Sequence, residues 1–246
     1  LEAILEAVDI IRGLAKSRPE VFRTNLAVTL NNLSNRFNAL GRREEALDAI
    51  EEAVDIRRGL AESRPEDFRP DLANSLNGLS GVLSVRGRPE DAFKASEEAV
   101  DISRDLASAG PEAFHPDLAM SLTNLSNRLS ALGSREATLD AIQRAVDIHR
   151  DLAEARPEAF RSDLATSVNN LPSHLSDLGK HEAALDAIQE SVDIRRGLAE
   201  ARPEAFHNYL ARSLGLRGDV LKELGRMDEA RAAFAEALER SEEHTS

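Results

Sequence analysis

Apolar residues recur at helical spacing in two kinds of segment that alternate along the chain. In the first kind they fall at offsets 0, 4, 7, 11 and 14, which is one stripe of an amphipathic helix. The earliest copy of this stripe is Leu26, Leu30, Leu33, Phe37 and Leu40. A comparable stripe runs through residues 43–62, and no alternation of period two is present. The pattern therefore predicts helices throughout and no strands.

Four residue series repeat with a single period of 46 residues. The series are Gly41, Gly87, Gly133, Gly179 and Gly225; Pro19, Pro65, Pro111, Pro157 and Pro203; Phe22, Phe68, Phe114, Phe160 and Phe206; and the tripeptide Val-Asp-Ile starting at 8, 54, 100, 146 and 192. Independent series that share one period define an internal repeat.

Glycine and proline divide each repeat into two helices. Gly41 and its equivalents are expected just past the first helix, in the left-handed conformation that closes a helix end. Proline cannot continue the preceding helix, so the Arg-Pro-Glu-x-Phe stretch is expected to be a loop with its Phe packed beneath it. Pro70 and Pro116 are then expected in the first turn of the next helix. The first helices are predicted near 24–40, 70–86, 116–132, 162–178 and 208–224.

Five helix pairs follow a leading half-repeat at residues 1–16 that matches only a second helix. Neither one helix nor one pair can bury its apolar face alone, so stacking of neighbours must create the core. The sequence predicts an all-α fold, a single α-solenoid of stacked antiparallel helix pairs over residues 1–239. A long coiled coil is excluded, because 46 is not a multiple of seven.

The pattern Gly-x-x-x-Glu-Ala-Leu-x-Ala-x-x-x-Ala at 41–53 resembles the tetratricopeptide repeat (TPR), and residues 225–238 resemble it most closely. The family period is usually 34 residues, and the longer period is similar to that of the kinesin light chain and of long-repeat arrays in bacterial and fungal signalling proteins. The resemblance implies a right-handed superhelix that is not catalytic and holds a peptide or partner protein in a concave groove lined by the first helices. The groove lysines that would bind C-terminal carboxylates are absent beside the asparagines at 31, 77 and 169.

The ends of the chain suggest a fragment of a larger signalling or scaffold protein. Residue 1 is Leu and falls within a predicted helix, and residues 240–246 resemble the translation of a sequencing adapter. We therefore expect 240–246 to be a non-native tail.

Composition narrows the functional classes. The chain has 31 Lys+Arg against 44 Asp+Glu, a net charge of −13, which argues against a nucleic-acid partner. It has no Cys and no apolar run of the ~20 residues that a membrane span needs. The six His residues form no pair at metal spacing, and no glycine-rich phosphate loop is present. We expect a cytoplasmic protein that is not an enzyme, with no cofactor, no metal and no membrane partner.

Acidic residues crowd the second segment of each repeat, as in Glu44, Glu45 and Asp48, away from its apolar stripe. We expect a solvated convex face, paired in part with Arg57 and Arg58 on the same helix. The alternative is a docking face for a basic partner.

Asparagine is unexpectedly frequent in the first segments, although it is a poor helix former. An amide can donate and accept at once, so it can pair with the backbone of a peptide. An equally weighted alternative is a ladder of amides that bind neighbouring helices. The candidate partner-binding residues are Asn31, Asn35, Asn38, Asn74, Asn77, Asn124, Asn127, Asn169 and Asn170, joined in the fifth repeat by Arg212 and Lys222.

The favoured function is a protein-interaction module that binds a peptide or partner protein in its groove. The alternative is a structural, self-associating scaffold without a peptide ligand. One local departure affects the groove: Pro172 stands in the middle of the fourth first helix, where a kink is expected.

Overall fold

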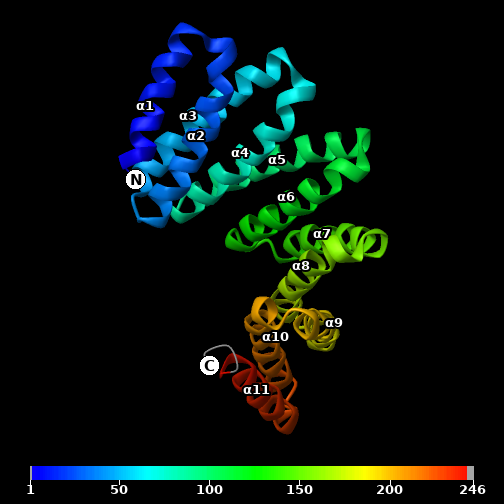
Figure 1. Ribbon diagram of the computed structural model, residues 1–246. Helices are drawn as coiled ribbons and strands as arrows, with labels where there is room; N and C mark the ends of the chain where they lie inside the picture. The colour runs from blue at the N-terminus through cyan, green and yellow to red at the C-terminus, as the bar shows by residue number, and fades with distance from the viewer. Residues whose placement is uncertain (1, 243–246) are drawn as a thin grey trace. The chain divides into compact units, whose positions relative to one another are not determined.

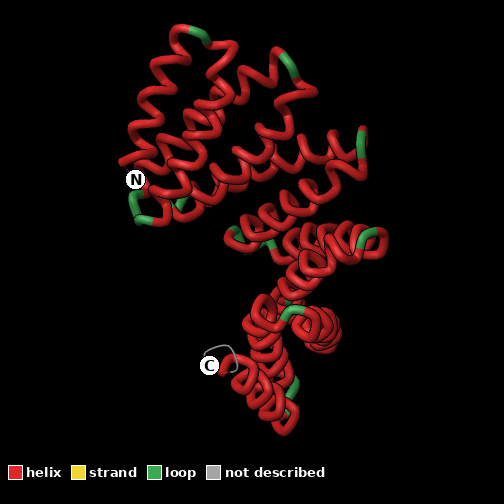
Figure 2. Tube along the Cα trace, viewed as in Figure 1, coloured by secondary structure: helices red, strands yellow, loops and turns green. Residues whose placement is uncertain are grey.

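The computed structural model describes residues 2–242, and within them every regular element is an α-helix and none is a strand (Figures 1 and 2). The first helices of the repeats are α2 (Pro19–Ala39), α4 (Pro65–Val85), α6 (Pro111–Ala131), α8 (Pro157–Asp177) and α10 (Pro203–Glu223). The second helices are α1 (Glu2–Ser17), α3 (Arg43–Ser63), α5 (Pro89–Ala109), α7 (Arg135–Ala155), α9 (His181–Ala201) and α11 (Met227–Glu242). Of the expected tail, residues 240–242 continue α11, and 243–246 lie outside the described residues.

The chain divides into two compact units, residues 1–132 with α1 to α6 and residues 133–246 with α7 to α11. Within each unit every helix packs antiparallel on the next one (Figure 1). First helices also contact each other, α2 with α4, α4 with α6, and α8 with α10. The expected all-α stack of antiparallel helix pairs is confirmed; a single domain over 1–239 stays a prediction.

Small side chains let the helices approach closely. Ala46, Ala53, Ala92 and Ala99 on the second helices are completely buried. Larger residues such as Leu30 fill the remaining space between them. The core therefore forms by close packing between neighbouring helices.

The glycine stops adopt the predicted conformation. Gly41, Gly87, Gly133, Gly179 and Gly225 all have φ between 71° and 75°. After Gly41, the N–H of Arg42 donates to the carbonyl of Phe37 at 2.9 Å, which satisfies an otherwise unpaired helix end.

The first helices begin earlier than predicted, at Pro19 rather than near residue 24 in the first repeat. Proline has the φ angle of a first helical residue and needs no donor there, so it starts the next helix after a single linking residue. The Phe of the motif therefore lies in the first helical turn and not under a loop. In the second, fourth and fifth repeats the preceding Arg covers its ring, as with Arg64 4.6 Å from the centroid of Phe68, which accounts for the Arg-Pro-Glu-x-Phe spacing there.

Pro70 and Pro116 lie inside α4 and α6 and not in their first turns, so that expectation was wrong. The proline five residues earlier already starts each helix, and the second proline only removes one internal hydrogen bond. Pro172 also lies inside a helix, α8, which continues through it to Asp177. A kink at Pro172 stays a prediction.

Candidate functional site

Three of the candidate asparagines bind the next first helix. Each pairs with a buried serine 44 residues further along the chain. The pairs are Asn31–Ser75 at 3.4 Å, Asn77–Ser121 at 2.9 Å and Asn169–Ser213 at 2.7 Å. The three serines are completely buried. These amides therefore join neighbouring helices, as the ladder alternative describes.

A second-helix side chain completes each of these contacts. Arg195 donates from Nη1 to the side chain of Asn169 at 3.0 Å, to the carbonyl of Tyr209 at 2.9 Å and to Ser213. Burial, together with the nearby positive charge of Arg212, lowers the pKa of Arg195 to about 10. Such a buried cation keeps its charge at neutral pH only because several acceptors surround it.

The repeat places Arg57, Ser103 and His149 at the same position as Arg195. Arg57 donates to Ser75 and to the carbonyl of Asp71 at 2.9 Å. The expectation that Arg57 pairs with acidic residues on its own helix was therefore wrong, because its side chain turns inward.

His149 lies 2.7 Å from Ser167, with its Nδ1 facing the serine Oγ. Sequence reasoning missed this pair, although its repeat position marked His149 as the equivalent of Arg57. Both side chains are buried, at 8% and 4% exposure, so a substrate could not reach the serine. Burial lowers the pKa of His149, against the opposing effects of Asp163 and the Ala145 backbone. We interpret the pair as a structural hydrogen bond between α7 and α8.

The other candidate amides face outward. Asn35, Asn38, Asn74 and Asn127 are exposed, and Asn124 and Asn170 are half-buried. Arg212 and Lys222 are also exposed. None of these six amide groups forms a hydrogen bond to a residue that the structure describes. Their donors and acceptors are therefore available to a partner.

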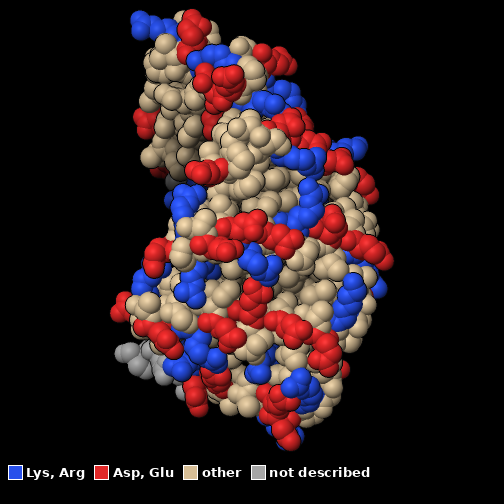
Figure 3. All heavy atoms as spheres, turned by 90° about the vertical axis from the view of Figure 1, so that its right-hand side faces the viewer, with Lys and Arg blue, Asp and Glu red and all other residues tan. Residues whose placement is uncertain are grey.

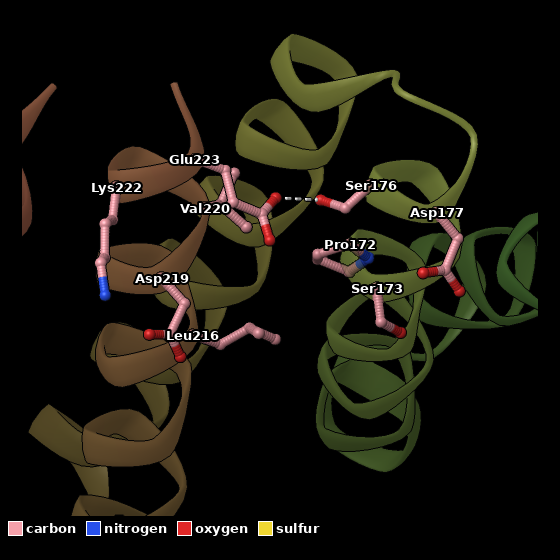
Figure 4. Close-up of a pocket in the computed structure, with 9 residues that line it drawn as sticks. All are labelled: Pro172, Ser173, Ser176, Asp177, Leu216, Asp219, Val220, Lys222 and Glu223. Carbon is pink, nitrogen blue, oxygen red and sulfur yellow. Dashed lines mark hydrogen bonds between the residues drawn. The ribbon is translucent and has the colours of Figure 1, made fainter. Parts of the chain in front are cut away.

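The outward positions line open depressions on the first-helix surface. One, of about 570 Å³, lies between α8 and α10 (Figure 4). Its lining residues are Pro172, Ser173, Ser176, Asp177, Leu216, Asp219, Val220, Lys222 and Glu223. Another, of about 480 Å³, lies between α1 and α2 and is lined by Ile4, Asn32, Asn35, Arg36 and Ala39.

The two depressions use the same repeat positions. Ser173 and Asp219 are the equivalents of Asn35, three and four periods further along, and Lys222 is the equivalent of Asn38. The outward asparagines and residues around the α8–α10 depression thus occupy the same positions of the repeat, which hold amides in the early repeats and charges in the fifth.

The second helices carry a different arrangement. Arginines bind glutamates 40 residues further along, on the next second helix: Arg12–Glu52, Arg58–Glu98, Arg150–Glu190 and Arg196–Glu236, at 2.7 to 3.1 Å. Arg58 therefore pairs with the next second helix, not with its own. Figure 3 shows acidic and basic side chains intermingled on the face that it presents. This favours a solvated surface over a docking face for a basic partner.

Two further features, a metal-binding cluster and a membrane-spanning helix, are absent from the described residues. Residues 2–242 contain no group of three His, Asp or Glu side chains placed to hold a metal ion. No helix among them is long and apolar enough to cross a membrane.

Comparison with known families finds the same kind of repeat along most of the chain. Residues 26–64, 72–117 and 118–156 match one family model described as tetratricopeptide repeat, and residues 163–243 match a second with the same description. No curated protein matches the chain.

Solved structures share the fold at low sequence identity. BtubC (BKLC) from P. vanneervenii is 18% identical with a TM-score of 0.80, covering 100% of this chain and 91% of its own. A kinesin light chain-like protein from Podosopora anserina, whose TPR-like repeats are nearly identical to one another, is 17% identical to this chain with a TM-score of 0.70, covering 89% of this chain and 96% of its own. YrrB, a TPR protein with an unusual peptide-binding site, is 15% identical with a TM-score of 0.53, covering 96% and 94%.

Proposed function

Because the chain belongs to the tetratricopeptide repeat family, whose arrays are protein–protein interaction modules and typically not enzymes, we propose that its first helices bind an extended peptide or a segment of a partner protein. The observation that carries the proposal is the row of outward amides without an internal partner. An amide left outside the helix packing costs a few tenths of a kcal/mol relative to Ala, so a binding role accounts for its presence better than stability does.

The groups on this surface suit an extended backbone. Asn35 and Asn127 are both exposed and occupy the same position in repeats one and three. Each amide can accept a peptide N–H and donate to a peptide carbonyl, whatever the side chains of the peptide. The peptide-binding site of YrrB, a protein of the same fold, supports this use of the repeats.

The test compares two pairs of asparagines. Peptides that bind the chain are first selected from a random phage-displayed library, and their affinities are measured by titration calorimetry. Replacing Asn35 and Asn127 together with Ala is expected to weaken binding about tenfold or more, since each hydrogen bond contributes ~1 kcal/mol. The melting temperature should not fall, because Ala is the better helix former.

Two control variants separate binding from stability. Replacing Asn31 and Asn169 removes amides that hold helices together, so the melting temperature should fall. Replacing Asp48 and Asp140, which are exposed on second helices, should change neither quantity. An unchanged affinity for the Asn35/Asn127 variant would overturn the proposal.

A self-associating scaffold is the second candidate, and exposed apolar side chains on α11 favour it. Met227, Phe234 and Leu238 are 46%, 39% and 60% exposed. Association through this face would give a mass that rises with concentration in light scattering, and Leu238→Glu should abolish the rise. A concentration-independent monomer would exclude this alternative.

A further inference from the structure

Resting on the proposed function, we propose that the depression between α8 and α10 binds a lysine or arginine side chain of the peptide. The depression combines an apolar floor with carboxylates at its rim. Pro172 and Val220 are buried and Leu216 is half-buried, whereas Asp177, Asp219 and Glu223 are exposed. Lysine and arginine have the matching form, an apolar stem that ends in a cation.

The carboxylates are free to accept a cation. Asp177 and Asp219 form no side-chain hydrogen bond or salt bridge with a residue in the described part of the chain. Glu223 accepts hydrogen bonds from Ser176 at 2.8 Å and from His181 at 3.1 Å, both at Oε2. These contacts hold the carboxylate in place and leave Oε1 for a ligand.

The lysine in the lining does not neutralise the site. Figure 4 shows Lys222 on the side of α10 that is turned away from α8, while Glu223 and Pro172 face one another. Asp219 points to the same side of α10 as Lys222 and Asp177 lies on the side of α8 away from α10, so Glu223 is the carboxylate that points into the space between the two helices (Figure 4).

Other first helices lack this charge. The repeat position of Asp177 and Glu223 is uncharged in the first three repeats, where it holds Ala39, Val85 and Ala131. The position of Asp219 is likewise uncharged there and holds Asn35, Gly81 and Asn127. The negative charge is thus confined to the pair α8 and α10.

The test selects random nonamer peptides on phage against the wild-type chain and against the variant Asp177→Asn/Asp219→Asn/Glu223→Gln. The control is Asp151→Asn/Asp186→Asn/Glu200→Gln, which removes the same charge from exposed positions on α7 and α9. Thermal melts confirm that all three proteins fold. Fluorescein-labelled copies of the selected peptides, and copies with Gln for each Lys or Arg, are then titrated by fluorescence polarisation at low and high salt.

Lys or Arg beside an apolar residue is expected to be enriched with the wild type and the control but not with the site variant. The affinity of a basic peptide should be about tenfold or more lower for the site variant than for the wild type. For the wild type, replacing Lys or Arg of the peptide with Gln, or raising the salt concentration, should weaken binding to a similar extent. Selected peptides without basic enrichment, or equal losses in site and control variants, would overturn this inference and leave the proposed function intact. Failure to select any peptide sensitive to Asn35 and Asn127 would overturn both.

Discussion

The hydroxyl of Ser213 donates a 2.7 Å hydrogen bond to the side-chain oxygen of Asn169, one first helix earlier. The same oxygen accepts from Arg195 on α9 at 3.0 Å, so one amide joins three helices. Its neighbour Asn170 makes no side-chain hydrogen bond within the described residues. Adjacent asparagines therefore have different physical roles.

Asn169→Ala is expected to destabilise the protein by ~1–3 kcal/mol, because Arg195 and Ser213 lose a buried acceptor. Urea unfolding followed by circular dichroism measures the change. Asn170→Ala is the matched control and should be neutral or slightly stabilising, since Ala is the better helix former. Equal effects of the two substitutions would show that the Asn169 contact contributes nothing.

His149 predicts a pH dependence of stability. Burial lowers its pKa in the folded chain, so the unfolded chain binds a proton there more readily. The free energy of unfolding should therefore hold its full value above the ordinary histidine pKa of about 6.5 and decrease as the pH falls below it.

Chemical unfolding at pH 7.5 and pH 5 tests this, with His149→Ser as the comparison, because Ser occupies the equivalent position at 103. Burial lowers the pKa of His174 as well, so some loss at low pH should persist in the variant. The contribution of His149 is the difference between the two proteins in the free energy of unfolding that is lost between pH 7.5 and pH 5. Identical pH profiles would contradict it.

Gly218 permits a close contact with Phe234. A Cβ at 218 would lie 2.6 Å from the phenylalanine ring, so Gly218→Ala is expected to cost ~1–3 kcal/mol through overpacking. Gly215→Ala in the same helix meets no atom within 4 Å and should stabilise by ~0.5–1 kcal/mol. Thermal melts of the two variants, and of Gly218→Ala combined with Phe234→Ala, separate the clash from helix propensity. If Gly218→Ala costs as much in a Phe234→Ala background as in the wild type, the clash is not the cause.

The leading helix α1 should exchange its amide hydrogens faster than α3. It has only two buried side chains, Val8 and Ala15, whereas α3 has ten. Local opening requires least free energy where few apolar contacts are lost. Hydrogen exchange measured by mass spectrometry checks the order, and equal protection of the two helices would contradict it.

The helical stack and its glycine stops followed from the sequence, because both depend on local rules. An apolar stripe defines a helix face, and a residue such as Gly41 favours a left-handed turn wherever it stands. The helix starts were placed five residues late, because Pro65 and Pro70 each satisfy the rules for a first turn and only packing shows which one begins the helix.

The roles of the asparagines could not be separated in the same way. Asn31 and Asn35 lie one helical turn apart and share a stripe in the sequence. Asn31 nevertheless meets Ser75, because α4 packs against that end of the stripe, and Asn35 remains exposed. The acidic depression escaped notice for a related reason: Asp177 and Asp219 come from different helices and line the same depression only in the folded unit.

The arginine–glutamate pairs between second helices bear on how such an array can lengthen in evolution. Arg58 binds a glutamate 40 residues ahead, and the 46-residue segment that contains it also contains Glu52, the acceptor for Arg12. A tandem duplication of that segment would carry one donor and one acceptor together. Both junctions of the inserted copy would then be complementary without any further mutation, so repeats can be gained or lost by unequal recombination while the contacts between neighbours persist.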